Sequence, residues 1–204
     1  MAERSAHIDT FAAQNLPPPD MLPDLIFTRP ELHYPGRLNC AAELLDRAVA
    51  EGDGERPAIL APDLRWSYTE LQHKANCIAQ LLSKELGVVP GNRVLLRAAN
   101  TAMLAACWLG VVKAGAIAVG TMPLLRAREL SWVIDKAEVV LALCDEKLGE
   151  ELAGAQNLSP RLERIIHFGG GDSCELEELM AAKSGDFTAV DNAAEDICFI
   201  AFTS

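Results

Sequence analysis

Apolar and polar positions follow two different rhythms along this chain. In some stretches, such as EVVLALC at 138–144 and DICFIAF at 196–202, nearly every residue is apolar, as in strands buried on both faces. In the stretches between such runs, apolar residues recur every three or four positions, which predicts helices. The expected strands are PAILAP, RWS, RVLLRA, AIAVG, EVVLALC, RIIHF and DICFIAF. Alternating strands and helices predict an α/β fold, a mostly parallel β-sheet with helices on both faces.

Capping residues indicate where the expected helices begin and end. Ser67 followed by Glu70 has the form of a capping box, and Gly87 terminates the helix behind it. Asn39 can cap another helix, which Gly52 ends. Further helices are expected from Asn100 or Thr101 to Lys113, from Arg126 to Lys136, from Glu146 to Leu152, and from Asp172 or Ser173 through ELEELMAA.

The first 38 residues differ from the rest because they are rich in proline. They contain LPPPDMLP, then Pro30 and Pro35. Proline fixes φ and removes a backbone donor, so this segment is expected to be an extended arm. Its apolar residues predict that the arm packs against the body of the protein. We therefore divide the chain into a Pro-rich arm at 1–38 and an α/β unit at 39–204.

Charge and cysteine content narrow the range of partners. A net charge of −11 argues against nucleic acid, whose phosphates need a surplus of Lys and Arg, although backbone amides can still hold a nucleotide. The most apolar stretch, 94–125, contains Arg97 and Lys113, and neither uncharged half reaches the ~20 residues of a membrane span. The six cysteines form no C-x-x-C pair, so we expect reduced thiols in a cytoplasmic protein, not a zinc site or a disulfide framework.

Two familiar kinds of catalytic motif are absent. The triple glycine at 169–171 follows an expected strand, but it lacks the spacing of a G-x-G-x-x-G dinucleotide fingerprint, which favours a surface turn. The sequence has no G-x-S-x-G elbow, and we recognise no cysteine with a histidine close by, although adjacency in space stays open. No catalytic residue and no metal ligand are therefore assigned.

The chain ends on a third candidate, Thr203 and Ser204, two small hydroxyl residues after the apolar strand DICFIAF. Ligands of parallel α/β sheets bind at the carboxyl ends of the strands. A loop of small residues at that edge can aim successive backbone N–H groups at phosphate oxygens. These two residues alone are a weak signal, which needs support from the rest of the chain.

Three segments resemble motifs of the AMP-forming acyl-CoA ligases, an adenylate-forming family, and their order and separation also fit that family. The segments are WSYTEL (66–71), WLGVVKAGAIAVGTMPLL (108–125) and EDICFIAFTS (195–204). Gly120 stands where that family more often has proline. The last segment resembles the strand that runs into the phosphate loop, whose family form continues T-S-G-T-T-G-x-P-K-G. Residues 34–59, YPGRLNCAAELLDRAVAEGDGERPAI, are similar to the opening of benzoate- and 2-aminobenzoate-CoA ligases.

The resemblance implies part of the large N-terminal domain of an adenylate-forming enzyme, with Thr203 and Ser204 as the first two residues of the ATP phosphate-binding loop. For the intact enzyme it implies ATP, Mg²⁺ and coenzyme A, and an aromatic carboxylate as substrate. It also implies a truncated domain that neither turns over nor tightly binds a cofactor by itself. A homodimer stays open. Two alternatives also stay open: a stand-alone α/β binding or interaction module without catalysis, and a nicotinamide-dependent oxidoreductase that uses the triple glycine.

Overall fold

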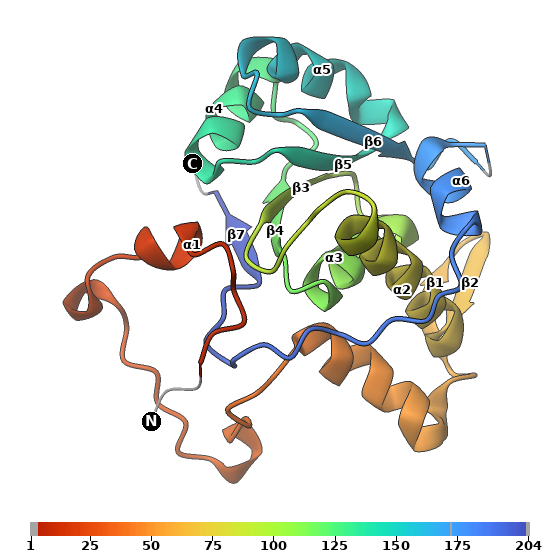
Figure 1. Cartoon of the computed structure of the whole chain (residues 1–204). Coiled ribbons are helices and arrows are strands. Elements are labelled where there is room, and N and C mark those ends of the chain that lie inside the picture. Colours follow the sequence, from red (N-terminus) through yellow and green to blue (C-terminus); the bar gives the residue numbers. More distant parts are fainter. Residues whose placement is uncertain (1–3, 172, 203–204) are drawn as a thin grey trace.

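A computed structural model describes residues 4–171 and 173–202, and most of them surround one parallel β-sheet (Figure 1). The strand order is β6-β5-β3-β4-β7, and each neighbouring pair is parallel. A separate antiparallel hairpin is formed by β1 and β2. The strands are β1 (Pro57–Ala61), β2 (Leu64–Ser67), β3 (Arg93–Arg97), β4 (Ile117–Thr121), β5 (Leu141–Asp145), β6 (Arg164–Phe168) and β7 (Phe199–Ala201). The expected parallel α/β sheet is confirmed.

Helices cover both faces of the sheet and enclose two apolar cores (Figure 1). The helices are α1 (Phe11–Gln14), α2 (Tyr68–Lys84), α3 (Ala102–Lys113), α4 (Ala127–Ala137), α5 (Gly149–Leu158) and α6 (Glu175–Ala181). The first core lies under α2, α3 and α6, and the second lies under α4 and α5. Val94 and Leu96 of β3 belong to the first core and Leu95 to the second, because successive side chains of a strand point to opposite faces.

Local capping explains where the helices on the first face begin. The Glu70 N–H donates to the Ser67 Oγ at 3.2 Å, and the Ser67 N–H donates to the Glu70 carboxylate at 2.8 Å, so the expected capping box is confirmed. Thr101 accepts from the Leu104 N–H at 3.2 Å at the start of α3. The Asn39 side chain caps its helix as expected, but that helix contains two wider π-helical stretches, Ala42–Asp46 and Val49–Asp53.

Several expected element boundaries are wrong. The expected helix from Glu146 to Leu152 is a short 3₁₀ turn followed by α5, which continues to Leu158. The largest difference is the final strand, which was expected to be buried from 196 to 202. β7 contains three residues and lies at an edge of the sheet, with β4 as its partner and no strand on its other side among the described residues. One of its edges is therefore unpaired, and the Phe199 side chain is 46% exposed.

The N-terminal arm packs against the body over only part of its length. The N–H groups of Ile8 and Asp9 both donate to the Pro90 carbonyl at 3.0 Å, and the Asp9 carboxylate pairs with Arg93. Further along, large apolar side chains of the arm are exposed, which corrects the expectation that the whole arm is packed. These exposed residues are Leu16, Met21, Leu22, Leu25, Ile26, Phe27, Leu32 and Tyr34. The arm lies away from the sheet in this region (Figure 1).

Both charged residues that interrupt the apolar stretch 94–125 are buried. Lys113 forms an ion pair with Asp46, and burial is the main cause that lowers the pKa of Lys113. Among the described residues, no helix has the length and apolar character needed to cross a membrane. The six cysteines are free thiols, as expected.

Candidate functional site

The carboxyl ends of β3, β4 and β7 meet at one edge of the sheet. Leu96 pairs with Gly120, and Gly120 pairs with Ala201, so the three strands end at the same level. This is the edge at which parallel α/β proteins bind ligands. Thr203 and Ser204 lie outside the described residues, but the strand that precedes them lies at this edge.

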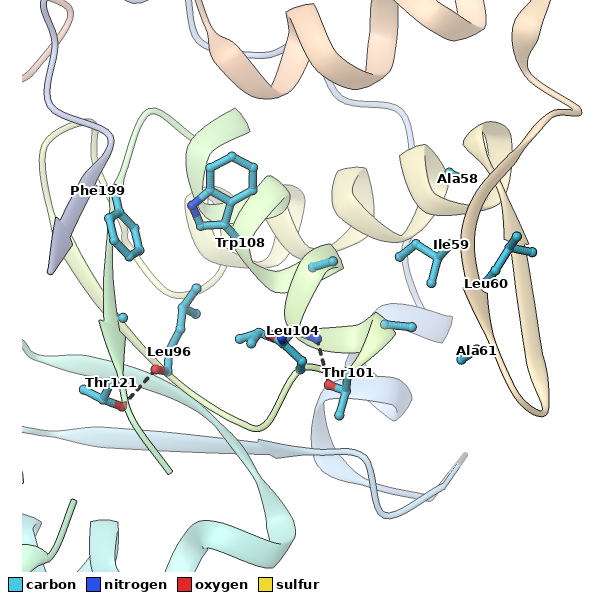
Figure 2. A pocket seen from close by; sticks show the side chains of 14 residues that line it. Ala58, Ile59, Leu60, Ala61, Leu96, Thr101, Leu104, Trp108, Thr121 and Phe199 are labelled. Atoms are coloured by element: carbon cyan, nitrogen blue, oxygen red, sulfur yellow. Dashed lines mark hydrogen bonds between the residues drawn. The ribbon is translucent and has the colours of Figure 1, made fainter. Parts of the chain in front are cut away.

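An apolar cavity of about 620 Å³ lies beside β4 and β7 on the face that α3 covers. Figure 2 shows that the β1–β2 hairpin forms one wall, α3 contributes Leu104 and Trp108, and β7 contributes Phe199. Its polar lining is limited to Asn100, Thr101 and Thr121, and the Thr121 hydroxyl donates to the Leu96 carbonyl at 3.0 Å. No charged side chain lines this cavity, so it suits an apolar ligand or an apolar segment of protein.

A second cavity, of about 880 Å³, lies beside the same two strands on the side of α4. Its lining includes Leu125, Arg128, Glu129, Trp132 and Phe202. The Trp132 and Phe202 rings meet edge to face, with their centroids 5.5 Å apart. Gly120 and Thr121 line both cavities. The end of β7 therefore lies between two cavities, at the position from which Thr203 and Ser204 continue.

Arg97 holds the loop that borders the second cavity. Its guanidinium donates to the carbonyl groups of Met122, Pro123, Leu125 and Leu148 at 2.9–3.2 Å, and the side chain is buried. Burial is the main cause that lowers the pKa of Arg97. Because its donors are used by main-chain carbonyls, Arg97 fixes the loop after β4 and is not free to bind a phosphate.

The triple glycine does not form a phosphate-binding loop. Gly169 and Gly171 have φ values of +85° and +96°, as in a glycine-rich turn. The Asp145 carboxylate lies within 4 Å of the space a Cβ on Gly169 would take, and the Glu146 carboxylate lies against Gly170. The Gly169 N–H donates to Glu177 at 2.9 Å. Carboxylates surround this loop, which would repel a phosphate, so the expected surface turn is supported.

One cysteine–histidine pair was missed in the sequence. His73 and Cys77 lie one turn apart on α2, with His73 Nε2 3.6 Å from Cys77 Sγ. Burial raises the pKa of the Cys77 thiol, which is nearly inaccessible. A buried thiol of this kind is a poor nucleophile. Among the described residues, no group of three or more His, Cys, Asp and Glu side chains is arranged to hold a metal ion.

Three residues at the carboxyl edge of the sheet, Arg97, Trp132 and Phe199, were not identified as candidate site residues from the sequence. Arg97 is a charged residue at the end of an apolar strand. Trp132 lies outside the apolar stripe of Leu130, Val133 and Ile134, and its side chain is 58% exposed. Phe199 was assigned to a buried strand, and its position beside a cavity depends on strand order.

Comparison with known proteins identifies relatives of the chain. The family model of the AMP-binding enzymes matches residues 45–204. A benzoate–CoA ligase of Thauera aromatica is 25% identical over 177 residues, which cover 87% of this chain and 34% of that protein. A 3-hydroxybenzoate–CoA ligase of Aromatoleum sp. (strain CIB) is 27% identical over 178 residues, which cover 83% of this chain and 32% of that protein.

A solved structure also matches the fold. The anthranilate CoA ligase AuaEII, in complex with anthranoyl-AMP, aligns with a TM-score of 0.74 at 26% identity. The alignment covers 81% of this chain and 31% of that one. The chain thus spans about a third of the length of the relatives that it matches.

Proposed function

The chain belongs to the AMP-binding enzyme family. We propose that it is part of an ATP-dependent acid–thiol ligase that forms a CoA thioester from an aromatic acid. The main support is that the family match includes the strand that leads to Thr203 and Ser204. That strand ends between two cavities at the carboxyl edge of the sheet. The aromatic-acid ligases among the relatives support the choice of substrate.

The proposed reaction has two steps. A carboxylate oxygen attacks the α-phosphorus of ATP, which gives an acyl-adenylate and releases pyrophosphate. The thiolate of coenzyme A then attacks the acyl carbon, and AMP leaves with the electrons of the broken C–O bond. AMP is a far better leaving group than the oxide of a free carboxylate, so the first step makes the second one feasible. Alignment of the attacking oxygen with the phosphoanhydride bond and neutralisation of phosphate charge are the main requirements.

In this proposal the described residues position the phosphate-binding segment. The β4–β7 pairing fixes the direction in which the backbone leaves Phe202, and Arg97 holds the neighbouring loop. The N–H and hydroxyl groups of Thr203 and Ser204 would donate to ATP phosphate oxygens. Bound magnesium would neutralise phosphate charge, but the described residues offer no ligand cluster for it, so no step is assigned to the metal here.

The substrate is proposed to be benzoate or 2-aminobenzoate. Assays of the protein encoded by the complete gene measure pyrophosphate release with each acid, with octanoate as an aliphatic comparison. The expected result is ATP-dependent release that is fastest with an aromatic acid, followed by thioester formation when coenzyme A is added. Fastest turnover with octanoate overturns the aromatic assignment, and no release with any carboxylate overturns the ligase assignment.

The 204 residues alone are proposed to be inactive. No histidine or cysteine lines the two cavities at the sheet edge among the described residues, and the one carboxylate, that of Glu129, already accepts from the Arg126 N–H at 2.8 Å. Incubation of the purified chain with ATP, magnesium and each acid, followed by mass spectrometry for acyl-adenylate, tests this. Acyl-adenylate above the no-protein control would contradict it.

A further inference from the structure

Cys40 and Cys198 lie side by side although 158 positions separate them in sequence. Their sulfur atoms are 3.8 Å apart. Cys40 directly follows the Asn39 cap of its helix, and Cys198 directly precedes β7. Both thiols are partly exposed, whereas the other cysteines, Cys77, Cys107, Cys144 and Cys174, are buried. This pair is therefore the most accessible thiol site of the chain.

A small cavity gives reagents access to the pair. Its volume is about 70 Å³, and both cysteines line it together with Asn39, Val112 and Asp196. Asp196 is the charged residue of this lining, and its carboxylate accepts from the N–H groups of Ala6 and Ala193 at 2.9 Å. The cavity can admit a molecule about the size of one or two waters, which is the size range of a peroxide.

The contact between the two thiols activates one of them. The Cys40 S–H donates to the Cys198 sulfur, and this hydrogen bond is the main cause that lowers the pKa of Cys198 to about 6. The same contact raises the pKa of Cys40, because the pair holds one proton more firmly than two separate thiols would. A thiolate is the form that attacks oxidants, so the lowered pKa favours Cys198 as the attacking cysteine of the pair.

We propose that Cys40 and Cys198 form an oxidisable pair that hydrogen peroxide converts into a disulfide. The Cys198 thiolate attacks a peroxide oxygen, the O–O bond breaks, and hydroxide leaves, which gives a sulfenic acid on Cys198. The Cys40 sulfur then attacks the Cys198 sulfur and displaces its hydroxyl group, which leaves as water with the Cys40 proton. The two thiols lose two electrons in total and the peroxide gains them. A disulfide bond needs sulfur atoms about 2.05 Å apart, so the pair moves together by less than about 2 Å.

Oxidation would fasten the start of the Asn39 helix to the strand that leads to Thr203. The Cys198 carbonyl already accepts from the Ala118 N–H at 3.0 Å, so the disulfide would connect that helix to the register of β4 and β7. A restraint of this kind on β7 would make phosphate binding sensitive to oxidants. This last consequence rests on the proposed function, whereas formation of the disulfide does not.

The test follows the covalent bond by mass, so it is independent of ligase activity. The 204-residue chain is treated with hydrogen peroxide, alkylated, digested without reductant and analysed by mass spectrometry. The expected product is a peptide pair that joins Cys40 to Cys198 and separates on addition of dithiothreitol. Absence of this pair while the protein stays folded, or disulfides spread over the buried cysteines, would overturn the proposal.

Single cysteine variants distinguish the cysteine that attacks the peroxide, Cys198, from the cysteine that then completes the disulfide, Cys40. In Cys40→Ser, dimedone is expected to trap a sulfenic acid on Cys198. In Cys198→Ser, Cys40 is expected to react more slowly than Cys198 does in the unaltered chain, because no thiol then donates a hydrogen bond to the reacting sulfur. Cys174→Ser is the matched control and should still form the linked pair. The unaltered chain supplies a readout that no folding defect affects: iodoacetamide should modify Cys198 before the other cysteines. Equal modification of Cys198 and the buried cysteines contradicts the proposal.

Discussion

The Phe199 ring lies directly against Gly120, so closely that a Cβ on Gly120 would come within 2.8 Å of the Phe199 Cζ. Gly120 belongs to β4 and Phe199 to β7. The two residues are diagonal neighbours, because Phe199 pairs with Ala118 and Gly120 pairs with Ala201. The absence of a side chain at Gly120 lets the ring lie along β4 at the first cavity. This contact accounts for a glycine where the related family more often has proline.

Replacement of Gly120 by alanine should loosen the β4–β7 contact. We expect Gly120→Ala to lower the free energy of unfolding by about 1 kcal/mol or less, below the usual range for overpacking, because the exposed Phe199 ring can turn aside. Urea denaturation of the 204-residue chain measures this. In a Phe199→Leu background, Gly120→Ala should lower the free energy of unfolding by less, because the smaller side chain leaves room for the new methyl group. An equal cost in both backgrounds would show that the ring is not the obstacle.

Arg97 should be the most important polar side chain for the loop after β4. Arg97→Met leaves four carbonyl groups without their donors, so we expect a loss of about 3 kcal/mol or more in the free energy of unfolding. Limited proteolysis should also cleave the loop at 122–125 faster than in the unaltered chain.

Arg126→Met is the matched control, because Arg126 is exposed and pairs with Glu151 at the surface. It should leave urea unfolding and proteolysis almost unchanged. An Arg97→Met variant as stable as this control would show that the carbonyl contacts of Arg97 are not needed.

Acid should release the N-terminal arm. Burial raises the pKa of Asp9, but hydrogen bonds from the Phe11 N–H, Arg93 and Asn92 outweigh it and hold this pKa below its usual value. A carboxyl whose pKa is lowered on folding stabilises the fold above its unfolded pKa of about 4, and this contribution disappears as pH falls through the folded pKa. Hydrogen exchange of residues 8–12 should therefore accelerate as pH is lowered below about 4, after correction for the intrinsic exchange rate.

The Asp9→Asn variant should remove most of this pH dependence, because an amide does not titrate. The control is Asp20→Asn, in the exposed part of the arm. In this variant, hydrogen exchange of the arm should depend on pH as it does in the unaltered chain. If Asp9→Asn retained the full pH dependence, Asp9 would not be the group responsible.

Local signals predicted much of this fold, whereas strand order and long-range contacts were not predictable. The capping box of Ser67 and Glu70 and the apolar run of β5 depend on neighbours in sequence, and both are confirmed. The edge position of β7 depends on which strands pair, which apolar content does not encode. The contact of Cys40 with Cys198 spans 158 positions and leaves no periodic pattern. In the sequence, Arg97 is only a charged residue within an apolar stretch. The structure shows its role, because its guanidinium donates hydrogen bonds to the carbonyl groups of the loop after β4.

The central claim is that the end of β7 delivers Thr203 and Ser204 to the phosphates of ATP. The most direct measurement is the dependence of pyrophosphate release on ATP concentration in the protein encoded by the complete gene. It is compared among Thr203→Ala, Ser204→Ala and the control Ser131→Ala, which replaces a hydroxyl on α4 that lines neither cavity. We expect each of the first two to lower kcat/KM for ATP by about ten- to a hundredfold, the effect of losing a hydrogen bond to a charged group, with KM for the acid little changed. The control should match the unaltered protein. Full kcat/KM for ATP in both Thr203→Ala and Ser204→Ala would contradict the account.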